Sequence, residues 1–462
     1  MLESSVDTVT IGAGGGAYPA GFRLARAGLK VVMVDSRGVM SGNCLAEGCV
    51  PSKAVREVAQ LYRRARAAES MGITGSLSAS YEGVLAHKAW VQNLRYRQHA
   101  EELAAADPRL RLVAGSAKLI DPHTVEVEAP SGSQRISARS VIVASGSDVS
   151  VPELPGAELC LTSRDFFALE PSLRHLPKSL VVIGAGYIGL EVASILHTFG
   201  TDVEVLEMEE QILPGMDPGF ASLLRSNLDE GIRVRLGAKV EAVAASPTGL
   251  LVTYREAGRT ATVGAEKVLL AVGRHPVLPE GLEEAGVEVK AGVPLVNHAL
   301  QTTAPHIYAP GDVNGRSMLF HAAVRQSLAV ANCILQGDRP VDQVDWLAVP
   351  TTVFTFPEAA FVGLLPARAR ELGVEVLEAA YSFEEDSRAQ ILGELEGEVR
   401  LFFAPGSLRL LGGWVVGVDA AQLIGEMGTA VAAGLNAHQL ARFADQHPMA
   451  SEGIGKAARK LV

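Results

Sequence analysis

The chain repeats one pattern of apolar residues, glycines and an acid, first over residues 6–35 and again over 180–207. In each copy a short apolar run enters a glycine-rich turn and a helix-like segment follows. A second apolar run then ends in an acid 23 residues after the first glycine. The glycines and acids are Gly12, Gly14 and Asp35 in the first copy, and Gly184, Gly186, Gly189 and Glu207 in the second. The repeat predicts two similar strand–helix–strand units.

Both units match the fingerprint of dinucleotide-binding folds. The glycines let the backbone approach a pyrophosphate at a helix N-terminus, and the acid accepts hydrogen bonds from ribose hydroxyls. Glycine-rich turns also arise from tight packing alone, but here each copy has its strand, helix and acid in place. The first copy has Ala17 at the third glycine position, which the pattern allows.

Glu207 indicates which nucleotide the second unit prefers. A carboxylate there accepts from a free 2′-hydroxyl and repels a 2′-phosphate, and no arginine follows it in the segment MEEQIL. The second site is therefore predicted to prefer NAD over NADP. The alternative is a solvated acid at the end of a strand.

Length and composition exclude several classes of protein. At 462 residues the chain is long enough for two to four domains. A formal net charge of −11, without any lysine- or arginine-rich run, argues against nucleic acid as a partner. No stretch of about 18 uninterrupted apolar residues occurs, so no membrane span is predicted.

Two of the four cysteines stand close together. Cys44 and Cys49 are five residues apart, whereas Cys160 and Cys333 are isolated and are interpreted as packing residues. In a regular helix such a pair has Cα atoms roughly 8–9 Å apart, beyond the roughly 4.4–6.8 Å that a disulfide needs. The pair can close only where the helix start is distorted, and Gly48 provides that freedom.

The chemistry of this pair has three interpretations. A pair at a helix N-terminus would have stabilised thiolates and a labile disulfide. A metal site lacks a second cysteine or histidine pair at ligand spacing. Two buried free thiols are the third possibility. Four cysteines in so long a chain do not form a disulfide scaffold, which makes a reducing cytoplasm the expected compartment.

Ordered motifs along nearly the whole chain carry a family resemblance. They are GNCLAEGCVPSK (42–53), ASGS (144–147), VIGAGYIGLE (182–191), AVGR (271–274), APGDVNG (309–315), PTTVFTFPEAAFVG (350–363) and HPMASE (447–452). With these segments the chain resembles the pyridine nucleotide–disulfide oxidoreductases, most closely the dihydrolipoamide dehydrogenases among them.

The resemblance implies two cofactors, FAD on the first unit and NAD on the second. It assigns Asp312 to the flavin's ribityl chain, and Lys53 and Glu191 to an ion pair beside the flavin's reactive nitrogen. An ion pair close to a ring that gains negative charge on reduction is physically sensible. Further cofactor-binding positions are Gly115, Gly146 and Gly273. Tyr187 either shields the flavin until nicotinamide enters or packs structurally, and His321 is expected to line the flavin region without acting as a base.

The resemblance also implies the catalytic groups. Cys44 and Cys49 would form a redox-active disulfide, with Cys44 meeting the substrate and Cys49 next to the flavin. His447 would accept the substrate's proton, with Glu452 fixing its tautomer. In this family the histidine comes from the partner subunit, so a homodimer with a shared active site is expected.

The fold class expected is α/β, with two Rossmann-like dinucleotide-binding domains and a C-terminal α+β dimerisation domain. The predicted limits are 1–148 for the first part of the FAD domain, 149–274 for the NAD domain, 275–345 for a central segment completing the FAD domain, and 346–462 for the dimerisation domain.

Several positions depart from the family pattern. Asn43 and Ala46 replace the usual threonine and asparagine around the first cysteine, and Met449 replaces a threonine after the histidine. Glu47 adds a carboxylate that is expected to disfavour thiolates at the cysteine pair.

The expected function is oxidation of protein-bound dihydrolipoamide by NAD⁺. The partners would be a lipoyl domain and the acyltransferase of a 2-oxo acid dehydrogenase complex. Two alternatives stay open: an NADH-dependent reductase of another disulfide, and a nucleotide-binding flavoprotein with a scaffolding or sensing role. Glutathione-type reductases prefer NADP, which Glu207 disfavours. Mercuric reductases usually carry a C-terminal cysteine pair, whereas this chain ends in GIGKAARKLV.

Overall fold

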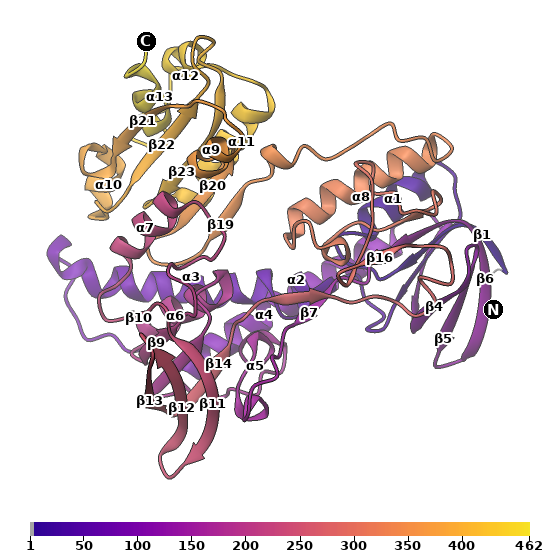
Figure 1. The fold of residues 1–462 in the computed structure, drawn as a ribbon, viewed down its shortest axis with the longest axis horizontal. Coiled ribbons are helices and arrows are strands. Elements are labelled where there is room, and N and C mark those ends of the chain that lie inside the picture. Colours follow the sequence, from indigo (N-terminus) through magenta and orange to yellow (C-terminus); the bar gives the residue numbers. More distant parts are fainter. Residues whose placement is uncertain (1–3) are drawn as a thin grey trace.

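The fold was examined in a computed structural model, which describes residues 4–462 (Figure 1). Its first sheet has seven strands in the order β3-β2-β1-β6-β5-β4, with β18 beside β6. The contacts β3·β2, β2·β1, β1·β6 and β6·β18 are parallel. The strands are β1 (Ser5–Ile11), β2 (Val31–Asp35), β3 (Leu110–Ala114), β4 (Ser116–Asp121), β5 (Thr124–Ala129), β6 (Gly132–Val143) and β18 (Ile307–Tyr308).

The second repeat unit forms a separate parallel sheet in the order β10-β9-β8-β14. A three-stranded antiparallel sheet, β11-β12-β13, accompanies it. The strands are β8 (Ser179–Ile183), β9 (Asp202–Leu206), β10 (Arg233–Arg235), β11 (Lys239–Ser246), β12 (Gly249–Glu256), β13 (Arg259–Ala265) and β14 (Lys267–Leu270). The apolar runs that form β1, β2, β8 and β9 are largely buried, as expected for parallel strands covered on both faces.

Equivalent helices follow the first strand of each unit, α1 (Tyr18–Arg26) and α6 (Tyr187–Thr198). The predicted pair of strand–helix–strand units is therefore confirmed. Between the two sheets the chain passes through β7 (Ser147–Val149) and returns through β15 (Arg274–Pro276), and these two strands pair antiparallel. The residue limits of the predicted domains stay predictions.

A broken helix carries the cysteine pair. Helix α2 (Gly42–Ala46) ends before Glu47, and α3 (Cys49–Ala67) begins at Cys49. Gly48 separates them, and a Cβ there would lie 2.9 Å from the carbonyl oxygen of Asn43. The distortion predicted at Gly48 is thus present. Helix α3 packs against α2 and against α4 (Tyr81–Ala104).

The C-terminal part is a five-stranded antiparallel sheet in the order β19-β20-β23-β22-β21 with helices around it, drawn in orange and yellow in Figure 1. The strands are β19 (Thr351–Val353), β20 (Ala359–Gly363), β21 (Leu377–Ser382), β22 (Glu398–Phe403) and β23 (Leu410–Val416). Its helices are α9 (Pro366–Glu371), α10 (Ser387–Leu392), α11 (Ala420–Ala432), α12 (Ala437–Arg442) and α13 (Glu452–Arg459). This mixture agrees with the expected α+β character.

The remaining helices and strands lie between or beside these sheets. The α-helices are α5 (Ser163–Phe167), α7 (Pro218–Asn227) and α8 (Phe320–Leu335), and the short strands are β16 (Val289–Lys290) and β17 (Val293–Pro294). The 3₁₀ turns are η1 (Ala68–Met71), η2 (Ala157–Leu159), η3 (Asp312–Asn314), η4 (Trp346–Ala348) and η5 (Phe383–Glu385). Across residues 4–462, the structure contains no helix with both the length and the apolar character needed to cross a membrane.

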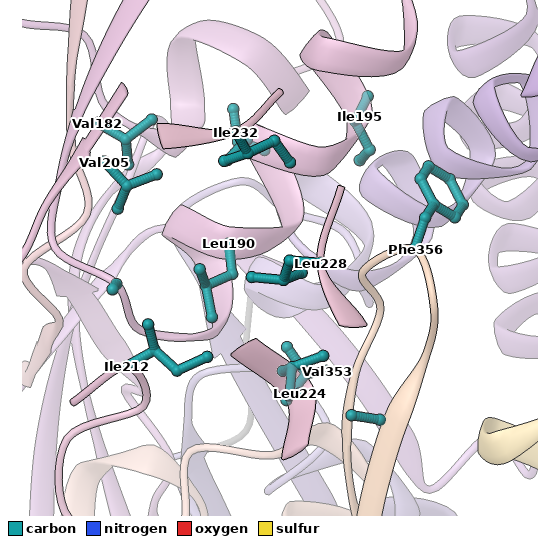
Figure 2. Close-up of a cluster of buried hydrophobic side chains, with 14 of the residues drawn as sticks. Val182, Leu190, Ile195, Val205, Ile212, Leu224, Leu228, Ile232, Val353 and Phe356 are labelled. Atoms are coloured by element: carbon teal, nitrogen blue, oxygen red, sulfur yellow. The ribbon is translucent and has the colours of Figure 1, made fainter. Parts of the chain in front are cut away.

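One apolar core joins the second nucleotide unit to the C-terminal sheet. Figure 2 shows Leu190 of α6 in a cluster that also contains Val353 of β19 and Phe356. The nucleotide fold and the C-terminal sheet therefore share buried surface and support each other.

The substitution Leu190→Ala should lower the free energy of unfolding by about 2–5 kcal/mol, because it removes a large side chain that is only 1% exposed. A shift of the urea unfolding midpoint measures this. Leu372→Ala, at a leucine that is 54% exposed, is the control and should change the midpoint little. Equal effects of the two variants would contradict the proposed core.

Candidate active site

The two glycine turns have the same backbone geometry. Gly12 has a φ of +104° and Gly184 a φ of +103°. A Cβ at Gly12 would lie 2.3 Å from the carbonyl oxygen of Ala144, and one at Gly184 would lie 2.6 Å from that of Ala271. Only glycine fits either position, because both the backbone angle and the neighbouring strand exclude a side chain.

The other two glycines of the second motif, Gly186 and Gly189, have different structural roles. A Cβ at Gly189 would lie 2.1 Å from the carbonyl oxygen of Gly184, so this glycine lets α6 pack closely on the turn. At Gly186 no atom lies within 4 Å of the Cβ position, which leaves the turn open toward a ligand. A pyrophosphate can therefore approach the backbone where α6 begins.

Both terminal acids reach back to their own glycine turn. The Asp35 carboxylate accepts a hydrogen bond from the backbone N–H of Ala13 at 3.1 Å, and Glu207 accepts from that of Ala185 at 2.7 Å. The matching contacts confirm that the two units are structurally equivalent. Lys239 was not predicted as a site residue. It lies near the second acid, because the backbone N–H of the preceding residue, Ala238, donates a hydrogen bond to the carbonyl oxygen of Glu207 at 2.8 Å.

A single cavity of about 2060 Å³ extends along both turns and past the cysteine pair. Most predicted site residues line it: Gly12, Gly14, Asp35, Cys44, Cys49, Lys53, Gly146, Gly184, Gly186, Glu191, Glu207, Gly273 and Asp312. Tyr187 and His321 also line it. Such a volume, bounded by two dinucleotide turns, fits a flavin dinucleotide and a nicotinamide dinucleotide placed end to end.

Four predicted residues lie outside the cavity lining of the described chain: Gly115, Gly189, His447 and Glu452. Gly115 has a steric reason of its own, since a Cβ there would lie 2.5 Å from the carbonyl oxygen of Glu128. It supports the sheet behind Asp35, whose carbonyl accepts a hydrogen bond from Gly115 N at 3.0 Å. His447 and Glu452 belong to the C-terminal part, described below.

Both cysteines of the pair are free thiols in the structure, so the expected disulfide is absent from it. A hydrogen bond between the two sulfurs lowers the pKa of Cys49 to about 7 and raises that of Cys44. The nearby ammonium of Lys53 favours the thiolate at both. Cys49 is therefore the thiol that ionises near neutral pH.

The predicted ion pair is formed. Lys53 Nζ on α3 lies 2.8 Å from Glu191 Oε2 on α6. The other carboxylate oxygen of Glu191 accepts a hydrogen bond from the backbone N–H of Phe354 at 3.1 Å, and Lys53 Nζ lies 4.2 Å from the centre of the Phe354 ring. Since the two charged residues are 138 positions apart, the fold places this pair beside the cysteines.

Asp312 is held in a small polar network on the cavity wall. Ser147 Oγ donates a hydrogen bond to its carboxylate at 2.6 Å, and Arg274 Nε donates to that hydroxyl at 2.9 Å. Burial raises the pKa of Asp312, and the hydrogen bond from Ser147 partly offsets this. The carboxylate thus faces the cavity in a position to accept from ligand hydroxyls.

Two further side chains on the wall have packing contacts. The Tyr187 hydroxyl contacts the sulfur of Met216 at 3.2 Å, and burial raises the pKa of Tyr187 to about 12. Tyr187 thus both lines the cavity and packs, so the structure leaves both interpretations of this residue open. His321 Nε2 lies 2.8 Å from the carbonyl oxygen of Pro350, a structural contact of the kind expected.

The histidine and glutamate of the C-terminal motif form a close pair. His447 Nδ1 lies 2.6 Å from Glu452 Oε1, and Lys456 pairs with the same carboxylate at 3.0 Å. The His447 side chain is 69% exposed. Within one chain it does not reach the cysteines, so its imidazole is free to serve another surface.

Glu47, which was expected to disfavour thiolates at the cysteine pair, is itself paired with cations, and its effect on the thiols stays a prediction. Its side chain is 7% exposed, with Arg164 Nε at 3.0 Å and Arg37 Nη2 at 3.5 Å. Two guanidinium groups thus balance the carboxylate. These partners could not be predicted from the sequence, because Arg164 lies 117 positions away.

Comparison with known proteins shows the family of this chain. The family model described as pyridine nucleotide-disulphide oxidoreductase matches residues 6–327, and its dimerisation domain matches residues 349–458. The chain belongs to the pyridine nucleotide-disulphide oxidoreductases. FAD and NAD, the cofactors expected from the sequence, are those of this family. The dimerisation-domain match supports a homodimer of this oxidoreductase.

Dihydrolipoyl dehydrogenases are among the proteins that this chain resembles in sequence. The chain is 33% identical to a dihydrolipoyl dehydrogenase of Bacillus subtilis, an alignment that covers 99% of this chain and 96% of that protein. It is 32% identical to one of Geobacillus stearothermophilus, with 98% and 95% covered.

Solved structures point to a different member. The Escherichia coli flavoprotein disulfide reductase RclA, described as HOCl-induced, was solved as a Cu(II) complex. It matches with a TM-score of 0.85 and 25% identity over the whole of both chains. A second RclA structure matches with a TM-score of 0.84 and 25% identity over 99% of this chain and all of the other. The family is shown, but these relatives carry different activity names, so the substrate is not settled.

The Lys53→Met variant should raise the pH at which Cys49 becomes reactive, since it removes a cation that stabilises the thiolate. In the wild type, alkylation by iodoacetamide should have a midpoint near the pKa of about 7 and fall roughly tenfold for each pH unit below it. Peptide mass spectrometry assigns the label to Cys49. Lys290→Met, at an exposed lysine on β16, should leave the midpoint unchanged, and an unchanged midpoint in Lys53→Met would contradict this role.

Proposed function

We propose that this oxidoreductase transfers electrons from dihydrolipoamide to NAD⁺ through the Cys44–Cys49 pair. The observation that carries the proposal is the position of the pair: both cysteines line the cavity that joins the two dinucleotide turns, beside the Lys53–Glu191 ion pair. The dihydrolipoyl dehydrogenases at 32–33% identity over nearly the full chain support this substrate.

The residues present fit the two cofactors. The turn at Gly14 and Asp35 would hold the adenosine diphosphate part of FAD, and Asp312 would bind its ribityl hydroxyls. The turn at Gly186 and Glu207 would hold NAD. When bound, FAD supplies a two-electron acceptor between the cysteine pair and NAD⁺.

The chain's own groups perform the sulfur chemistry. With the pair as a disulfide, one thiolate of the substrate attacks Cys44 Sγ and displaces Cys49 as a thiolate. The second substrate thiolate then attacks the mixed disulfide and releases Cys44, so the substrate leaves as a disulfide and the enzyme keeps two electrons. The lowered pKa of Cys49, about 7, makes it a good leaving group.

The protons require a base that a single chain does not bring to Cys44. His447 of the partner subunit would accept them, and Glu452 of the partner subunit would stabilise the resulting imidazolium. The active site is then shared between two subunits. We further propose a cytoplasmic location, a lipoyl domain as the electron donor, and an acyltransferase component as its carrier.

The test is steady-state turnover of dihydrolipoamide with NAD⁺ and with NADP⁺. Turnover should require Cys49, because Cys49→Ser cannot form the disulfide, and it should favour NAD⁺. In the wild type, NADH should also produce the long-wavelength absorbance of a thiolate beside oxidised flavin, and Cys49→Ser should lack it. Cys333→Ser, at a buried cysteine away from the cavity lining, is the matched control. Absence of lipoamide turnover in the wild type would exclude this substrate.

The variant His447→Gln should lower lipoamide turnover by about 10²–10⁴-fold, the usual contribution of a general base, while FAD content stays unchanged. His438→Gln, at an exposed histidine on α12, should have near-normal turnover. Near-normal turnover in His447→Gln would reject its assigned role.

A second candidate is reduction of another disulfide, or of a metal ion, by NADH. The RclA structures favour it, because that protein is named a flavoprotein disulfide reductase and was solved with Cu(II). A panel of glutathione disulfide, quinones and Cu(II) with NADH separates this function from lipoamide oxidation. Turnover with none of them, despite bound flavin, would favour a scaffolding or sensing role.

A further inference from the structure

Helix α2, which carries Cys44, is held by a side chain from outside every motif described above. With only five residues, α2 leaves its last carbonyls without helical partners. Gln92, fully buried on α4, donates hydrogen bonds from Nε2 to the carbonyl oxygens of Leu45 and Ala46, each at 3.0 Å. These carbonyls directly follow Cys44, so the amide of Gln92 fixes the backbone that positions its sulfur.

Arg164 holds the next residue of the same segment. Its Nε lies 3.0 Å from Glu47 Oε2, and its Nη2 lies 2.6 Å from Asp148 Oδ1. Glu47 follows α2 directly and is only 7% exposed, so its charge needs a nearby cation. Arg37, at 3.5 Å, is the more distant of its two guanidinium partners.

Helix α4 secures both of these contacts. Lys88, one turn before Gln92 and fully buried, donates to the carbonyl oxygens of Phe167 and Ala168 at the end of α5, the helix that carries Arg164. Gln92 also lies 3.4 Å from the carbonyl of Phe167. One face of α4 therefore fixes α2 and α5 relative to each other.

The three positions at which this segment departs from the family pattern all take part in such contacts. Asn43 Nδ2 donates to the carbonyl oxygen of Ser147 at 2.6 Å. The backbone carbonyl of Ala46 accepts a hydrogen bond from Gln92, and the carboxylate of Glu47 accepts one from Arg164. Asn43 and Glu47 thus have side-chain partners of their own, whereas the contact at position 46 is made by the backbone.

We propose that Gln92 and Arg164 are positioning residues for the Cys44–Cys49 pair. Gln92 holds the backbone of Cys44 at the distance that its contact with Cys49 requires. Arg164 is the nearer of the two guanidinium groups that balance the charge of Glu47, a residue two positions before Cys49. The inference rests on the thiol–disulfide chemistry of the proposed function, and not on which substrate that chemistry serves.

The measurable consequence is the ionisation of Cys49. The charged and titratable groups around it are Cys44 on α2, Lys53 on α3, Glu191 on α6, and Glu47 with its partners Arg37 and Arg164. Removing Arg164 leaves the nearly buried carboxylate of Glu47, two residues before Cys49, with only the more distant Arg37 as its cation, and the added negative charge disfavours the thiolate and raises the pKa of Cys49. Replacing Gln92 would loosen α2 and weaken the hydrogen bond between Cys44 and Cys49. This change also raises the pKa of Cys49.

The experiment measures iodoacetamide alkylation of the reduced holoprotein against pH, with the labelled cysteine identified by mass spectrometry. In Gln92→Met and in Arg164→Met the midpoint for Cys49 should move upward by roughly half a unit to one unit. In the double variant Glu47→Gln/Arg164→Met it should return to the wild-type value, because the uncompensated charge is gone. Arg164→Lys, which keeps the charge, should lie between wild type and Arg164→Met.

Matched controls remove similar groups elsewhere. Gln390→Met deletes an amide that donates to Glu384 O at 2.8 Å on α10, and Arg174→Met deletes an exposed ion pair with Glu170. Neither should move the midpoint. An unchanged midpoint in Arg164→Met, or a double variant that keeps the shift, would overturn the proposal. If Gln92→Met does not fold, the arginine series decides the question, because Arg164 is 40% exposed.

These outcomes are separate from the test of the proposed function. A shifted midpoint without lipoamide turnover would reject that substrate and support the positioning role. Normal lipoamide turnover with unshifted midpoints would support that substrate and reject the positioning role.

Discussion

One carboxylate connects the three parts of this molecule. Glu191 stands on the helix of the second nucleotide unit, binds Lys53 on the helix that begins at Cys49, and accepts the backbone N–H of Phe354 from the C-terminal part. A nearly buried carboxylate needs such partners, because leaving it unpaired away from water is costly. The position of the cysteine helix relative to the nucleotide sites therefore depends on this contact.

Features set by neighbouring residues could be predicted from the sequence. The positive φ at Gly12 and Gly184 follows from a strand that must turn sharply into a helix, and the motif spacing encodes this locally. The break at Gly48 was predictable for a similar reason, since two cysteines five apart cannot meet on a regular helix. Asp35 and Glu207 end their strands at the expected places.

Contacts between distant parts of the chain could not be derived in this way. The Lys53–Glu191 pair was predicted only through family resemblance, because either residue alone is an ordinary helix charge. The two guanidinium partners of Glu47 were missed, because neither lies near it in the sequence. Gln92 belongs to no motif, and only a weak signal could have marked it. The signal is that two polar residues, Lys88 and Gln92, occupy the buried face of the 24-residue helix α4.

The pairing of β7 with β15 has a consequence for how this chain can change. His275 lies opposite Asp148 and Pro276 opposite Ser147, so the chain leaves the first sheet and returns to it at adjacent points. The second nucleotide unit between these strands thus has its two ends side by side, and its core also packs on the C-terminal sheet. Its surface loops can therefore change in length without altering the path of the first sheet, as long as the contacts of this shared core are kept.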